Sequence, residues 1–179
     1  YYILYTQGEI RKHPDESLLS LQKAENLRNK KQLHYIYNTF IEYSYMIIYI
    51  RENEYEKAYE YAKKGYETYI DSRNLFLPYM ILLSIYLKKP KYDIHDYDPT
   101  DFNLNCISLY DLHNNHKPLE EIKLIIKYFP KAACENPCFE TCIHILSKII
   151  YQLSKETRRY KSVVRFFNKY QKYNRNYYL

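Results

Sequence analysis

Residues 32–71 decide the fold, and they read QLHYIYNTFIEYSYMIIYIRENEYEKAYEYAKKGYETYID. Apolar residues recur every three to four positions on both sides of Arg51-Glu52-Asn53, which predicts two helices, over 32–51 and 54–71, joined by a tight turn. The first helix is expected to turn seven residues inward: Leu33, Ile36, Tyr37, Phe40, Tyr43, Ile47 and Ile50. The second is expected to bury Tyr55, Ala58, Tyr59, Ala62, Tyr66 and Tyr69.

This hairpin has tetratricopeptide (TPR) character. Small residues stand where the second helix must approach its neighbours, and bulky aromatics flank the turn, as TPR hairpins require. The residues expected to make the repeat packing are Phe40, Tyr49, Tyr55, Ala58, Ala62 and Gly65. A single hairpin cannot bury its apolar face, so it must stack on neighbours. We therefore expect an all-α fold of TPR-like hairpins that form an α-solenoid.

The whole chain is expected to divide into three parts. Residues 1–89 are expected to be TPR-like repeats, 90–117 an irregular linker, and 118–179 a further repeat with a basic C-terminal helix. Further helices are expected to end near 2–11 and to span 14–27, 75–87, 118–128, 138–153 and 156–170. In the 14–27 helix, Leu18, Leu21, Ala24 and Leu27 are expected to form the inward stripe. Pro130 is expected to end the 118–128 helix. The linker is rich in Pro, Asp and Asn, and only 107–112 is expected to be helical there.

The apolar faces of the last two helices also follow the helical period. The 138–153 helix should bury Phe139, Cys142, Ile143, Leu146, Ile149, Ile150 and Leu153. The 156–170 helix should bury Tyr160, Val163, Val164 and Phe167.

The composition argues against an enzyme. The 179 residues include two Gly, so the chain lacks the glycine-rich loops that cradle phosphates, and nucleophile and metalloprotease motifs are missing as well. Neither a signal sequence nor an apolar run of about 18 residues is found, so a cytoplasmic protein is expected. An enzyme with an unrecognised site is the least favoured alternative.

Two groups of residues leave alternatives open. Cys134, Cys138 and Cys142 are spaced by four, unlike paired zinc ligands, so buried reduced thiols are expected and no metal site is assigned. His95 with Asp96 and Asp98 could be a metal or acid–base cluster, but a solvated loop of turn-forming residues is the favoured interpretation. His144 reads as a satisfied or edge histidine.

The basic residues are concentrated near the C-terminus. Eight basic residues and one acid stand between Lys155 and Leu179, whereas the whole chain has a net charge of +6. Helical spacing groups most of the basic side chains into one stripe, which predicts a macromolecule-binding surface of Arg158, Arg159, Lys161, Arg165, Lys169 and Lys172. Such a stripe can bind a phosphate backbone or an acidic protein. The alternative is an ordinary solvated helix face.

Several short stretches resemble one family. Phe40, Tyr49, Asn53, Tyr55 and Ala58, then Tyr69, Phe76 and Tyr79, fall at the family's spacing. Asp98-Pro99, Pro118-Leu119-Glu120-Glu121, and 140–145 follow in the family's order. In these features the chain resembles the auxiliary, ribosome-anchoring subunit of the NatA N-terminal acetyltransferase.

The resemblance implies a non-catalytic scaffold. In that family, stacked helical pairs encircle a catalytic acetyltransferase subunit and basic surfaces touch ribosomal RNA, so both become expected partners. An inositol polyphosphate between the subunits is implied as a cofactor, without assigned residues here. A generic TPR adaptor of a large assembly is the alternative.

Overall fold

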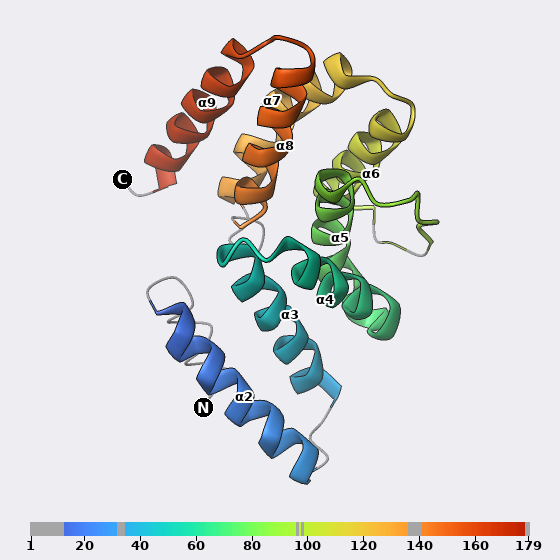
Figure 1. The fold of residues 1–179 in the computed structure, drawn as a ribbon, viewed down its shortest axis with the longest axis vertical. Coiled ribbons are helices and arrows are strands. Elements are labelled where there is room, and N and C mark those ends of the chain that lie inside the picture. The colour runs from blue at the N-terminus through green and yellow to red at the C-terminus, as the bar shows by residue number, and fades with distance from the viewer. Residues whose placement is uncertain (1–12, 32–34, 96, 98, 136–140, 178–179) are drawn as a thin grey trace. The chain divides into compact units, whose positions relative to one another are not determined.

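All regular structure in the described part of the chain is helical. The structure is a computed structural model that describes residues 13–31, 35–95, 97, 99–135 and 141–177 (Figure 1). The chain divides into two compact units, residues 1–80 and 81–179, with the boundary inside helix α5 (Arg73–Leu87). The predicted all-α class is confirmed for these residues. None of their helices combines the length and apolar character needed to cross a membrane.

The first unit is built from α2 (Pro14–Lys31), α3 (Tyr35–Arg51), α4 (Tyr55–Thr68), the short 3-10 turn η1 (Ile70–Ser72) and the first half of α5. Helix α2 packs on α3, and α3 packs on α4 (Figure 1). All six α4-face residues predicted to be inward are buried: Tyr55, Ala58, Tyr59, Ala62, Tyr66 and Tyr69. The helical period alone therefore located this face.

Two predictions of inward residues in the first unit are wrong. Phe40 is 39% exposed, and Leu27 on α2, which was assigned to the same stripe as Leu21, is 38% exposed. On α3 the adjacent Ile41 is fully buried, and on α2 Leu21 and Ala24 are buried. The expected helix ending near 2–11 and the inward residues Leu33, Ile36 and Tyr37 lie outside the described side chains.

The predicted turn between α3 and α4 is confirmed. Asn53 has φ 60°, a left-handed backbone that asparagine tolerates better than most residues. The Glu54 amide donates to the Tyr49 carbonyl at 2.8 Å, and the Tyr55 hydroxyl donates to Oδ1 of Asn53 at 2.8 Å. These bonds satisfy the end of α3 and reverse the chain within three residues.

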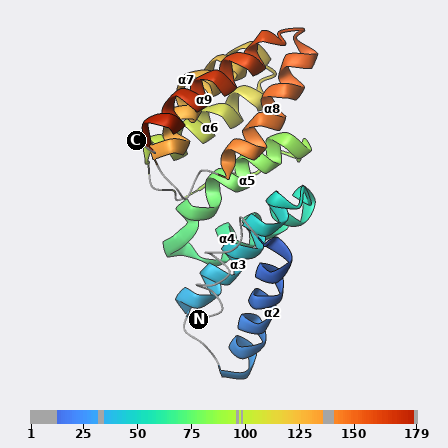
Figure 2. The same cartoon turned by 90° about the vertical axis from the view of Figure 1, so that its left-hand side faces the viewer.

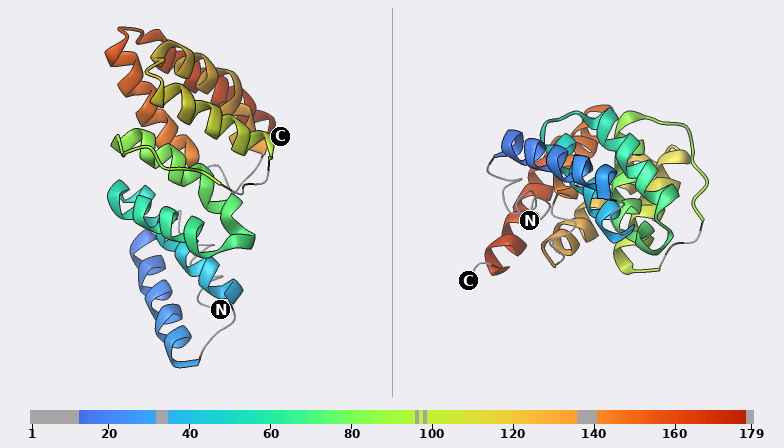
Figure 3. Two further views of the ribbon diagram at one scale, coloured as in Figure 1. Left: turned by 90° about the vertical axis from the view of Figure 1, so that its right-hand side faces the viewer. Right: turned by 90° about the horizontal axis from the view of Figure 1, so that it is seen from below.

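The second unit contains the end of α5, then α6 (Asp101–Asn114), α7 (Pro118–Glu135), α8 (Cys142–Glu156) and α9 (Lys161–Tyr177). Helix α7 is central, because α6, α8 and α9 all pack against it. Figures 2 and 3 show α7 and α9 lying side by side. The core of the second unit includes Phe129, Leu146, Ile150 and Phe166, which are all fully buried.

The predicted linker at 90–117 is wrong for 101–114, which form α6 rather than a short helix at 107–112. The side chain of Thr100 caps this helix by accepting a hydrogen bond from the Asn103 amide at 3.3 Å. Its buried face holds Phe102, Cys106, Leu109 and Tyr110 at helical spacing. The described residues without helix here are 88–95, 97, 99–100 and 115–117, and the Tyr92 amide donates to the Tyr110 hydroxyl at 2.7 Å.

The predicted end of a helix at Pro130 is also wrong. Helix α7 continues through Pro130 to Glu135. Proline removes one backbone hydrogen bond from a helix interior. Here Phe129 and Pro130 are both buried, so tertiary packing outweighs that local cost.

Four of the described helices are followed by a left-handed residue that is not glycine. Asn53, Lys88, His116 and Arg158 have φ between 52° and 60°, each just after a helix. At Arg158 the amide donates to the Lys155 carbonyl, and the next amide, of Arg159, donates to the Ser154 carbonyl at 2.8 Å. This pair of bonds is the Schellman motif, which usually places glycine at the left-handed position. These short connections therefore depend on strained non-glycine caps.

Candidate macromolecule-binding surfaces

The six residues of the predicted basic stripe lie on two different elements. Lys161, Arg165 and Lys172 are exposed on α9, and Lys169 is half-buried there. Arg158 and Arg159 are exposed in the turn between α8 and α9, because α8 extends to Glu156 and α9 begins only at Lys161. The stripe is thus a short helical row continued by two turn arginines, and its binding role stays a prediction.

The apolar face predicted for α9 is wrong. Phe166 is fully buried and Ser162 is buried, so the buried face is rotated by roughly 100°, about one residue, from the expected one. Tyr160, Val164 and Phe167 are exposed instead, and Val163 is only half-buried. The rings of Phe166 and Phe167 meet edge to face, with centroids 5.5 Å apart.

A second basic row lies on α7 beside the α9 row. Lys123, Lys127 and Lys131 are exposed at spacings of four. The ammonium of Lys169 donates to the Lys127 carbonyl at 3.0 Å, which brings the two helices' basic edges together. Lys131 also forms an ion pair with Glu135 at 3.4 Å. Sequence reasoning missed this row, although its i, i+4, i+8 spacing was a readable signal.

Helix α8 carries a third exposed row. His144, Lys148, Tyr151 and Lys155 are spaced by four, three and four, so they share one solvent-facing stripe that contains no acid. The prediction of an edge histidine agrees with the exposure of His144. The opposite face buries Cys142, Ile143, Leu146, Ile149, Ile150 and Leu153, as predicted, while Phe139 lies outside the described residues.

One predicted packing residue of the α3–α4 hairpin, Gly65, lies very close to α5. Ala58 and Ala62 are fully buried and Gly65 is buried. A Cβ atom on Gly65 would lie 2.3 Å from Cδ1 of Phe76, so only glycine fits beside that ring. The Phe76 ring is itself held edge to face by Tyr43, with centroids 6.1 Å apart. Tyr49 is half-buried beside the turn.

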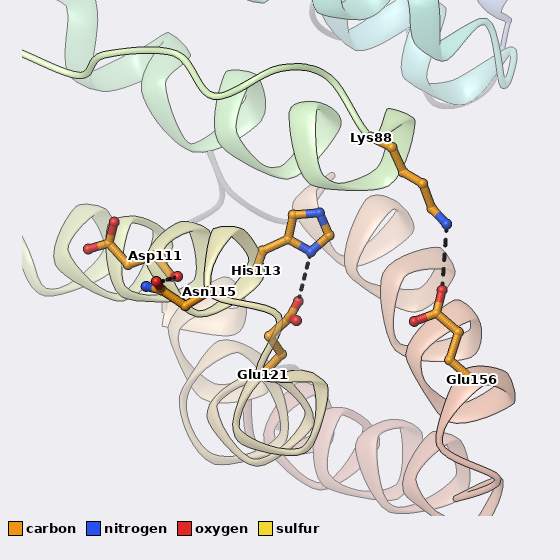
Figure 4. A network of polar contacts seen from close by, with 6 residues as sticks. All are labelled: Lys88, Asp111, His113, Asn115, Glu121 and Glu156. Atoms are coloured by element: carbon orange, nitrogen blue, oxygen red, sulfur yellow. Dashed lines mark hydrogen bonds and ion pairs between the residues drawn. The ribbon is translucent and has the colours of Figure 1, made fainter.

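Two buried carboxylates tie neighbouring helices together. Glu42 on α3 has 3% of its side chain exposed and accepts a 2.7 Å hydrogen bond from the ammonium of Lys64 on α4. Glu121 on α7 is 2% exposed and lies 3.2 Å from Nδ1 of His113 on α6 (Figure 4). Such contacts satisfy carboxylates that would otherwise be costly to bury.

The second unit also has an ion pair between the ends of α5 and α8. Lys88, at the end of α5, lies 3.6 Å from Glu156, the last residue of α8 (Figure 4). Both side chains are about half exposed or more, so this pair contributes little to stability. The pair does hold the carboxylate of Glu156, the acidic residue nearest to the α8–α9 turn.

A tyrosine cluster lines the contact between α3 and α4. Tyr61 stacks on Tyr45, with ring centroids 5.1 Å apart, and also contacts Tyr49 at 5.5 Å. Burial of Tyr45 raises its pKa well above the ordinary tyrosine value, and its 2.9 Å hydrogen bond to Glu25 on α2 adds to the effect. The cluster therefore links three helices of the first unit.

The described cysteines and His95 lie in separate places. Cys106 and Cys142 are buried, and burial raises the pKa of the Cys106 thiol well above its usual value, with a smaller effect from Cys142. Cys134 is partly buried, and Cys138 lies outside the described residues. His95 pairs with Asp93 at 3.1 Å on an exposed loop. Asp96 and Asp98 lie outside the described residues. Within those residues no three His, Cys, Asp or Glu side chains are arranged to hold a metal ion.

Comparison of the chain with models of protein families, with curated proteins and with solved structures finds no match.

Proposed function

We propose that this chain is part of a non-catalytic helical-repeat scaffold that holds a catalytic N-terminal acetyltransferase subunit and docks it on the ribosome, as the auxiliary subunit of NatA does. The proposal assigns the chain to TPR-like repeats of an α-solenoid. The expected location is the cytoplasm, next to the ribosome. The observation that carries it is the packing of the α3–α4 hairpin against α5.

The hairpin supports the proposal through its close packing. Buried small residues on α4 admit the neighbouring helix, and Gly65 receives the ring of Phe76 where no Cβ would fit. Close approach at small residues is the means by which helical pairs stack in repeat proteins. The family's sequence features coincide with this contact, since Tyr69 and Phe76, whose rings lie 6.1 Å apart, were among them.

The basic rows of the second unit support the docking part of the proposal. Exposed cations on α7, on α8 and α9, and in the turn between the last two greatly outnumber the acids there. A surface of one sign attracts the phosphates of ribosomal RNA at long range. Solvated faces normally mix both signs.

Co-purification tests the scaffold. Affinity purification of the full-length protein, followed by mass spectrometry, should recover a catalytic acetyltransferase subunit in near-stoichiometric amount. Recovery of other large assemblies without an acetyltransferase would reject the NatA part and favour a generic TPR adaptor. That alternative is favoured by the hairpin itself, because its packing specifies repeat stacking but not which partner is held.

Ribosome pelleting tests the docking surface. Reversing Arg158, Lys161 and Arg165 to Glu should weaken pelleting and flatten its salt dependence, since each lost phosphate contact reduces the salt slope by about 0.7–0.9. The matched control reverses Lys23, Lys57 and Lys91, three exposed cations away from the basic rows of α7, α8 and α9. Unchanged pelleting of the first variant would make the stripe a solvated face.

A further inference from the structure

Helix α9 has two apolar faces, and its own unit uses only one. Phe166 and Ser162 fill the contact with the rest of the unit. Val164 and Phe167 lie on the other side of the helix and are 59% and 39% exposed, and Tyr160, the residue before the helix, is 57% exposed. Scattered single exposed apolar residues are normal, but a group that follows the helical period is typical of an interaction face.

The exposed group has the spacing of a helix-pairing seam. Tyr160, Val164 and Phe167 are separated by four and three residues, which is the a/d spacing of a heptad, and Gln171 continues the row one turn further. We call Tyr160, Val164 and Phe167 the α9 seam. Its spacing suits a partner helix that lies along α9, not a single side chain inserted from a loop.

One border of the seam carries basic residues and no acid. Lys161, Arg165 and Lys172 stand along it, exposed, within one sector of the helix. Lys169 lies further round on the same side and bonds the Lys127 carbonyl, so the lysine row of α7 extends this border. The acids on the exposed face of α7 are Glu120 and Glu135, and Glu135 already pairs with Lys131.

We propose that the α9 seam binds an acidic amphipathic helix of a partner protein, with the partner's apolar residues on Tyr160, Val164 and Phe167 and its carboxylates on the basic border. Complementary charges flanking an apolar stripe are what select partners in helix pairing. This inference rests on the proposed scaffold function, because a scaffold needs a face on which another chain docks.

The composition of the seam separates this partner from the other occupants. Single-stranded RNA would stack on aromatic rings, but Val164, the most exposed of the three, offers no ring to stack on. A second copy of the chain would bring its own basic border against Lys161 and Arg165, and like charges across an interface are repelled. An acidic helix meets neither obstacle.

The test uses a designed, fluorescein-labelled 21-residue peptide with Leu at its a and d positions and Glu at its e and g positions. A peptide of the same composition in scrambled order is the control. Fluorescence anisotropy with the 179-residue chain should show binding of the patterned peptide that is at least about tenfold tighter than that of the scrambled one, and weaker at higher salt. Equal binding of both peptides would overturn the proposal.

Variants locate the binding. Val164→Ser with Phe167→Ser should weaken peptide binding about tenfold or more, whereas Tyr151→Ser, an equally exposed aromatic on α8, should leave it unchanged. Helical content measured by circular dichroism should be the same for all three proteins, since the changed side chains are exposed. Retention of full affinity by the seam variant would overturn the proposal.

Sedimentation and co-purification distinguish the seam proposal from self-association and from the proposed scaffold function. A dimer of the unmodified chain that dissociates in the seam variant would assign the seam to self-association and overturn the proposal. The seam variant should still pellet with ribosomes, which separates failure of the seam from failure of the docking surface. Peptide binding that persists while no acetyltransferase co-purifies would reject the NatA assignment and leave the seam standing.

Discussion

Replacing Gly65 by Ala should destabilise the first unit, although alanine is the better helix former. The added Cβ would lie 2.3–2.6 Å from three atoms of the Phe76 ring. That ring is fully buried and is contacted by Tyr43 and Tyr69, so it has little freedom to move away. Either the ring or helix α4 must shift.

The expected size follows from two opposing effects. Overpacking a well-packed core costs about 1–3 kcal/mol. Alanine inside a helix gains about 0.5–1 kcal/mol over glycine. The free energy of unfolding should therefore fall by about 1–2 kcal/mol in total.

Hydrogen exchange with mass spectrometry measures this effect locally. In Gly65→Ala, peptides spanning 55–80 should exchange faster, while peptides spanning 141–177 of the second unit serve as the internal control. Adding Phe76→Leu should recover about 1 kcal/mol relative to the sum of the single changes, because the smaller side chain leaves room for the Cβ. Slower exchange in Gly65→Ala, as helix propensity alone predicts, would refute the close approach.

Three further substitutions probe the caps, a buried carboxylate and the tyrosine cluster. Arg158→Gly should stabilise the protein by about 1 kcal/mol, since a left-handed arginine is strained, and thermal melts check this. His113→Ala should destabilise it by about 1–2 kcal/mol in urea titrations, because the 2% exposed Glu121 loses its partner, whereas His144→Ala on the surface should have little effect. The raised pKa of Tyr45 means that the unfolded chain loses this proton first, so stability should fall as pH rises above about 10, and Tyr45→Phe should reduce that fall in urea titrations across pH 9–11.

The sequence was most informative where one helical face dominates. Alternation of apolar and charged residues along α4 predicted its buried face, and the turn at Asn53 followed from the break in that pattern. Neither inference required knowledge of distant contacts, because a single amphipathic stripe leaves only one way to turn the helix.

Helices with mixed signals could not be predicted as well. Helix α9 has two apolar faces, and only the packing of Phe166 against the rest of the unit decides between them. Helix α6 was obscured by Pro99 and many turn-forming residues, although the Thr100 cap and the spacing of Phe102, Cys106 and Leu109 indicated it. In α7, burial overrides the local preference of Pro130.

The candidate surfaces were predicted in part. Spacing within one helix is enough to group Lys161, Arg165 and Lys172, which are exposed together. Spacing cannot show that α7 lies beside α9, a relation that the Lys169–Lys127 hydrogen bond makes visible. The α9 seam was not predicted as a surface, because the helical period of its apolar residues was interpreted as a buried face.

The most direct test of a non-catalytic scaffold measures acetyl transfer to an N-terminal peptide. Full-length protein purified from its own cells should carry acetyltransferase activity with a co-purified catalytic subunit, and the recombinant 179-residue chain alone should have none. Activity of the recombinant chain by itself, or an inactive cellular complex without an acetyltransferase subunit, would contradict the proposed function.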